Sequence, residues 1–135
     1  MRRDASEEAR RWVLQAQRDL DDARYASDGG RFNLACFLAQ QAAEKALKGF
    51  LYSEGAETVW GHSVAELCLD AAEIDVDFKK LIGVAGPLDK YYIPTRYPNG
   101  LPGGIPADAY TEGDAQMALS MAQQVLDFIQ ARVGS

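Results

Sequence analysis

The sequence is poor in the residues that build metal sites and disulfides. Its 135 residues include one histidine, His62, and two cysteines, Cys36 and Cys68, with no CxxC pair. A structural zinc site needs four such ligands at regular spacing, so we expect no metal site. Both cysteines stand among apolar residues, and we expect buried, reduced thiols of the kind found in cytosolic proteins.

Long apolar runs and an excess of positive charge are also missing. No stretch approaches the roughly 18 apolar residues of a membrane span. The beginning, "MRRDASEEARRW", lacks the apolar segment of a secretory signal. We therefore expect a cytoplasmic protein without a membrane partner. The net charge of −6 repels nucleic-acid phosphates, which argues against DNA and against broad RNA binding.

Helical periodicity dominates what the chain does contain. The strongest pattern is "FNLACFLAQQAAEKALKGFLYSEG", in which small and apolar residues recur at spacings of four and three from Phe32 to Phe50. Most of this stripe is alanine, so a neighbouring helix can approach closely. A first helix is predicted near Asp4, where Asp4 and Glu7 resemble a capping box.

Three further helical segments are predicted. One begins at the capping residue Ser63, one runs from Phe78 to about Tyr91 with a kink or break at Pro87, and the last opens at the N-cap Thr111. No segment alternates like a strand. The sequence therefore predicts a single all-α domain over residues 1–135, an antiparallel up-and-down bundle of four main helices plus a short one.

The polar residues of "QQAAEKALKG" allow two interpretations. Glu44, Lys45 and Lys48 form a face that, by itself, is typical of solvated surface. However, Gln40, Gln41 and Glu44 also stand beside the alanine stripe. There they could hydrogen-bond across a helix pair or to a partner.

The only histidine precedes the predicted cap of a helix. The N-terminal end of a helix carries partial positive charge, which favours a neutral imidazole or a bound anion. His62 is therefore a candidate for acid–base catalysis or for nucleotide binding. The alternative is a structural side chain of the capping region, packed against Trp60.

The segment "DKYYIPTRYPNG" opens a loop rich in proline, glycine and tyrosine that we predict over about residues 91–110. Lys90 and Arg96 are suitable donors for phosphate. Tyr92 and Tyr97, like the neighbouring Tyr91, offer rings on which a base can stack. The alternative is that the tyrosines cover the end of the bundle while their hydroxyls reach solvent.

Three segments in this order, "ACFLAQQAAEKALKGFLYSEG", "WGHSVAELC" and "LDKYYIPTRYPNG", resemble the HEPN domain family, the "higher eukaryotes and prokaryotes nucleotide-binding" domain. The resemblance covers nearly the whole chain and implies a helical bundle that forms a homodimer. It also implies a partner, because small prokaryotic members are typically paired with a minimal nucleotidyltransferase. Many such pairs look like toxin–antitoxin modules.

Other branches of the family are metal-independent RNases, whose signature places an arginine four to six residues before a histidine. This sequence departs from that signature, because residues 56–58 contain no arginine and no histidine follows Arg96. The resemblance thus favours a nucleotide- or substrate-binding partner of a nucleotidyltransferase without independent catalysis. The alternatives are an RNase toxin with an atypical His62/Arg96 site, and a purely protein-docking module. In some pairs the partner is thought to modify a HEPN tyrosine, for which Tyr97 is the expected acceptor.

Overall fold

The computed structural model describes residues 4–133, and every regular element within them is a helix. The predicted all-α bundle is thereby confirmed. The elements are α1 (Ala5–Asp28), α2 (Phe32–Ser53), α3 (Val64–Ala72), α4 (Phe78–Ala85), the 3₁₀ helices η1 (Gly86–Tyr91) and η2 (Pro98–Gly100), the single turn α5 (Pro106–Ala109), and α6 (Glu112–Val133).

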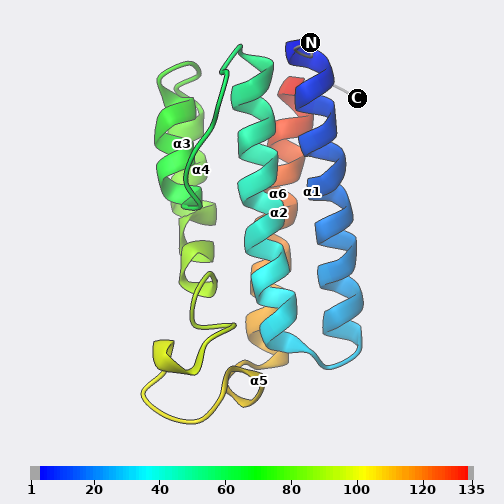
Figure 1. The fold of residues 1–135 in the computed structure, drawn as a ribbon, viewed down its shortest axis with the longest axis vertical. Coiled ribbons are helices and arrows are strands. Elements are labelled where there is room, and N and C mark those ends of the chain that lie inside the picture. Colours follow the sequence, from blue (N-terminus) through cyan, green and yellow to red (C-terminus); the bar gives the residue numbers. More distant parts are fainter. Residues whose placement is uncertain (1–3, 134–135) are drawn as a thin grey trace.

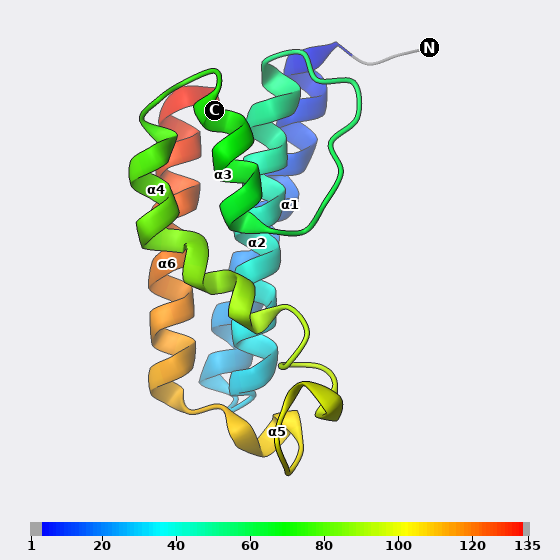
Figure 2. The same ribbon diagram turned by 90° about the vertical axis from the view of Figure 1, so that its left-hand side faces the viewer.

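Three long helices, α1, α2 and α6, lie side by side, and the shorter α3 and α4 cover one side of them (Figures 1 and 2). Helix α1 descends in Figure 1 and α2 returns upward. The chain then runs back down beside α2 as the segment 54–63, which contains no helix, so α3 rises in the same direction as α2. This descent brings residue 62 to the middle of α2.

The helix ends agree with the predicted capping residues. The side chains of Asp4 and Ser63 accept hydrogen bonds from the backbone N–H groups three residues on, at 2.9 and 3.1 Å. Thr111 does the same at 3.2 Å before α6. Pro87 divides the predicted fourth helix, because α4 ends at Ala85 and η1 continues as a tighter helix. The predicted long loop is more ordered than expected, since it contains η2 and α5.

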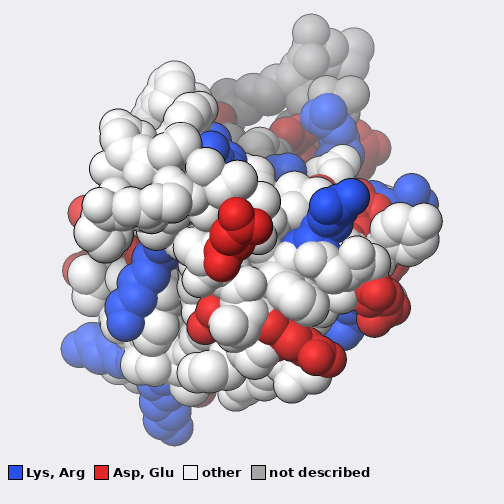
Figure 3. Space-filling view, turned by 90° about the horizontal axis from the view of Figure 1, so that it is seen from below, with Lys and Arg blue, Asp and Glu red and all other residues white. Residues whose placement is uncertain are grey.

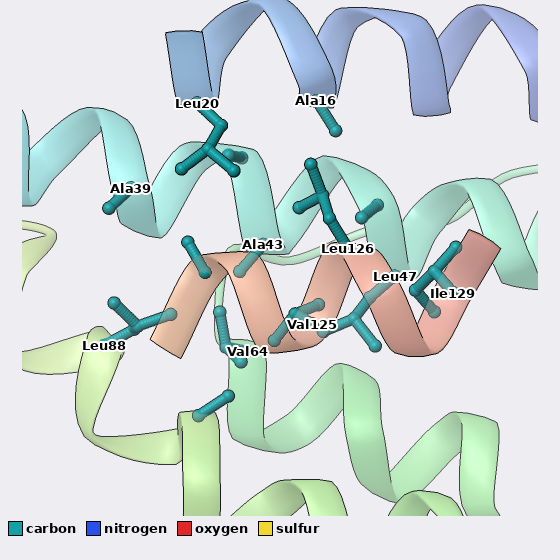
Figure 4. Close-up of a cluster of buried hydrophobic side chains, with 14 of the residues drawn as sticks. Ala16, Leu20, Ala39, Ala43, Leu47, Val64, Leu88, Val125, Leu126 and Ile129 are labelled. Carbon is teal, nitrogen blue, oxygen red and sulfur yellow. The ribbon is translucent and has the colours of Figure 1, made fainter. Parts of the chain in front are cut away.

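The alanine stripe of α2 allows close packing on both sides. Ala39, Ala43 and Ala46 are fully buried. Larger side chains from α1, α6 and α3 fill the space around Ala39 and Ala43 (Figure 4). At Gly49 a β-carbon would lie 3.0 Å from Val13 Cγ2 and 3.3 Å from a backbone oxygen of α1. Any side chain there would push α1 away from α2.

Both cysteines are buried and unpaired, as predicted. Burial, which disfavours the thiolate, raises the pKa of Cys36 and that of Cys68 to about 12. At neutral pH both thiols are protonated and therefore poor nucleophiles. Among the described helices, none is both long and apolar enough to cross a lipid bilayer.

Candidate functional site

The candidate site forms where the descending segment 54–63 meets the middle of α2. The His62 side chain is 58% exposed, yet its Nδ1 lies 3.2 and 3.3 Å from the two carboxylate oxygens of Glu44. Glu44 itself is only 5% exposed at its side chain. A buried carboxylate therefore contacts one edge of the ring, while more than half of the His62 side chain faces solvent.

Glu44 and Lys48 of α2 are buried, so the solvated-surface interpretation of these two residues was wrong. Lys48 Nζ lies 3.2 Å from Glu44 Oε2, and the exposed fractions of the two side chains are 8% and 5%. Lys45, half-buried, binds Asp19 on α1 at 2.6 Å. Because Glu44 and Lys48 are buried, each of these charges requires an opposite charge beside it.

The orientation of His62 is determined by three contacts. The buried Gln40 donates a hydrogen bond from Nε2 to the His62 carbonyl oxygen at 2.7 Å. The imidazole stacks on Tyr92, with ring centres 5.0 Å apart and an interplanar angle of 17°. The contact of Nδ1 with Glu44 is the third. The alternative packing of His62 against Trp60 does not hold the ring, because Trp60 is 83% exposed.

Arg96 lies over the same tyrosine. Its Cζ is 4.7 Å from the ring centre of Tyr92, 4.4 Å from that of Phe37 on α2 and 5.1 Å from that of Tyr97. The Arg96 Nε donates to the Tyr92 carbonyl oxygen at 2.8 Å. Its two terminal amino groups have no hydrogen-bond partner among the described residues, and the residue is exposed. They remain available for an oxyanion.

We call the five residues that meet here the Tyr92 cluster: Phe37, His62, Tyr92, Arg96 and Tyr97. Folding thus brings four of the predicted site residues together, although the sequence separates His62 from the others by about 30 positions. The remaining predicted site residue, Lys90, is exposed but makes none of the contacts of the cluster. Tyr91 instead packs edge-on against Tyr110 at 6.0 Å, so this tyrosine does cover the end of the bundle.

Asp89 joins the two segments that carry the cluster. Its carboxylate accepts hydrogen bonds from Ser63 Oγ at 2.7 Å and from the backbone N–H groups of Val64 and Ala65 at 2.7 and 3.1 Å. The carboxylate therefore caps α3, whose end is positively polarised, and holds it against η1. Sequence reasoning missed Asp89 and Phe37, because neither has a local pattern that indicates a role.

The end of the bundle that carries η2 and α5 shows no broad positive patch. On the end of the bundle shown in Figure 3, acidic and basic side chains are interspersed and most of the face carries neither. A large depression lies along α1, but none of the Tyr92 cluster lines it. With Arg96 as its cationic side chain, the cluster suits a ligand with few phosphates better than a long nucleic acid.

The fold and the cluster define a small helical-bundle protein with an exposed aromatic and cationic surface. The HEPN domain model matches residues 9–132, and the chain belongs to this family. No curated protein matches the chain.

Three solved structures support this assignment. The protein TT1696 from Thermus thermophilus is 46% identical, with a TM-score of 0.86 over 92% of this chain and 97% of its own. ST0689, an archaeal HEPN homologue, is 40% identical, with a TM-score of 0.77 over 98% and 99% of the two chains. The HEPN domain protein tm0613 from Thermotoga maritima is 27% identical, with a TM-score of 0.68 over 90% and 95%.

Proposed function

We propose that this HEPN protein binds a nucleotide at the Tyr92 cluster and has no independent catalytic activity. The observation that carries this proposal is that one tyrosine ring holds both His62 and Arg96 at an exposed surface. The free amino groups of Arg96 would bind phosphate bidentately. Tyr97, which is 50% exposed, would stack against the base.

The proposal predicts that Arg96→Ala weakens binding of ATP or GTP by about tenfold or more, since a charge-assisted hydrogen bond to phosphate is lost. Isothermal titration calorimetry at fixed salt measures this. Arg10→Ala, which removes an equal charge from the exposed surface of α1, should leave affinity unchanged. Equal affinity of Arg96→Ala and the unmodified protein would contradict the assignment.

We further propose that the protein is a cytoplasmic homodimer that works with a minimal nucleotidyltransferase in a toxin–antitoxin-like pair. Membership of the HEPN family supports this proposal. Tyr97 would then be the acceptor of an adenylyl group: its phenol oxygen attacks the α-phosphate of ATP, pyrophosphate leaves, and the phenol proton passes to solvent. Arg96, next to Tyr97, would bind the phosphates during the transfer.

Affinity capture of the tagged protein from its native lysate, read by mass spectrometry, should recover the nucleotidyltransferase. Incubation with that enzyme and ATP should raise the intact mass by at least one adenylyl group, and Tyr97→Phe should remove the increase. Tyr25→Phe is the matched control, because Tyr25 of α1 is even more exposed than Tyr97. A lone homodimer on capture, or a mass increase that persists in Tyr97→Phe, would contradict this proposal.

A second candidate function, a metal-independent RNase, is favoured by the Glu44–His62 contact. An imidazole with one nitrogen bound to a carboxylate and the other facing solvent is a common general-base arrangement. This candidate requires RNA cleavage in the presence of EDTA that is lost in His62→Ala. Cleavage that survives the substitution would exclude it.

A further inference from the structure

The Glu44–Lys48 pair determines which nitrogen of His62 carries a proton. Both Glu44 oxygens lie within 3.3 Å of Nδ1, and Lys48 Nζ lies 3.2 Å from Oε2. A carboxylate beside a buried ammonium group is ionised and can only accept hydrogen bonds. Nδ1 must therefore carry the proton. In the neutral ring Nε2 is then a bare acceptor.

Gln40, Glu44 and Tyr92 together leave only one edge of the imidazole available. The backbone of His62 is held by Gln40, one edge of the ring by Glu44, and the ring plane by stacking on Tyr92. The side chain is nevertheless 58% exposed, and no hydrogen bond to Nε2 is present among the described residues. An acceptor with fixed direction is thus presented at the surface of the Tyr92 cluster.

The ligand group that this acceptor fits follows from the tyrosine ring that His62 shares with Arg96. The His62 ring centre and the Arg96 Cζ lie 5.0 and 4.7 Å from the centre of the same tyrosine ring. If Arg96 binds the phosphates of a nucleotide, the next group along the ligand is the sugar. A ribose hydroxyl is a hydrogen-bond donor, which the bare Nε2 requires.

We infer that His62 Nε2 accepts a hydrogen bond from a ribose hydroxyl of the bound nucleotide, and that Glu44, paired with Lys48, is the positioning residue that holds His62 in the necessary tautomer. This inference rests on the proposed nucleotide site and names its ligand class: ribonucleotides that retain the sugar hydroxyls. Dideoxynucleotides leave the acceptor unpaired and bind more weakly.

Two measurements test the inference. The first compares ATP and GTP with their 2′,3′-dideoxy analogues by calorimetry. We expect the analogues to bind about three- to tenfold more weakly to the unmodified protein, the equivalent of one hydrogen bond. In His62→Ala the two kinds of nucleotide should bind equally.

The second measurement reads the tautomer directly, without any ligand. Because the chain has one histidine, ¹⁵N-histidine labelling gives a single pair of ring resonances. At pH 8 we expect the Nδ1–H tautomer. In the double variant Glu44→Leu/Lys48→Leu the carboxylate is gone and no charge is left unpaired, so the Nε2–H tautomer should appear and preference for the sugar hydroxyls should fall.

Different results would overturn the role of His62 and the proposed nucleotide site. Equal binding of nucleotides and dideoxy analogues to the unmodified protein, with a strong loss in Arg96→Ala, overturns the role of His62 and leaves the nucleotide site intact. An Nε2–H tautomer in the unmodified protein also overturns it. Absence of any binding of ATP or GTP overturns both proposals.

Discussion

Replacing Glu44 by leucine is expected to lower the free energy of unfolding by about 3–5 kcal/mol, because the substitution leaves the Lys48 ammonium group buried without its counter-charge. Glu44 and Lys48 are only 4% and 6% exposed. The cost arises mainly from the desolvation of the Lys48 ammonium group. In the native protein its 3.2 Å contact with Glu44 offsets that desolvation. Urea denaturation followed by far-ultraviolet circular dichroism measures the difference.

The control for this prediction is the double variant Glu44→Leu/Lys48→Leu. Replacing both members of a buried ion pair by apolar residues of similar volume is often neutral or stabilising. We therefore expect the double variant to be more stable than Glu44→Leu alone. If the single variant loses less than about 1 kcal/mol, Lys48 reaches solvent after the substitution and the pair is not a buried one.

Replacing Phe78 by alanine is expected to cost about 3–5 kcal/mol of stability, because it removes an aromatic ring from the junction of three helices. Phe78, the first residue of α4, is fully buried. Its ring centre lies 4.4 Å from that of Phe50 on α2 and 4.8 Å from that of Phe128 on α6. The resulting cavity would loosen the contact between α4 and the long helices.

Val84→Ala, on the same helix but 37% exposed, is the matched control for Phe78→Ala and should cost less than about 1 kcal/mol. Both variants can be measured in the same urea series, with the slope of the transition as a check on two-state unfolding. Similar losses in the two variants would show that α4 does not depend on its aromatic contacts with α2 and α6.

The sequence predicted the local features of this fold because each of them depends on neighbouring residues. The caps at Asp4, Ser63 and Thr111 form with groups three positions away, and Pro87 interrupts its own helix. The alanine stripe of α2 indicated close helix packing, which the burial of Ala39, Ala43 and Ala46 confirms. The segment predicted as a loop contains the short elements η2 and α5, which carry too little periodicity to be predicted from the sequence.

The candidate site depended more strongly on contacts between distant segments. The sequence singled out His62, Arg96 and the tyrosines by residue type alone and could not place His62 relative to Arg96. It allowed Glu44 to be either solvated or hydrogen-bonded across helices. The contact between Glu44 and His62 arises because residues 54–63 descend beside α2, and no local pattern encodes the path of that segment.

By itself, the sequence determined the helical class, the helix ends, the missing RNase signature and the resemblance to HEPN proteins, because these follow from short-range spacing and residue identity. Only the tertiary structure decided that Lys48 is buried against Glu44, that Asp89 caps a helix which begins 25 residues earlier, and that His62 and Arg96 share one tyrosine ring. The physical reason is that burial and ion pairing depend on which segments meet in three dimensions.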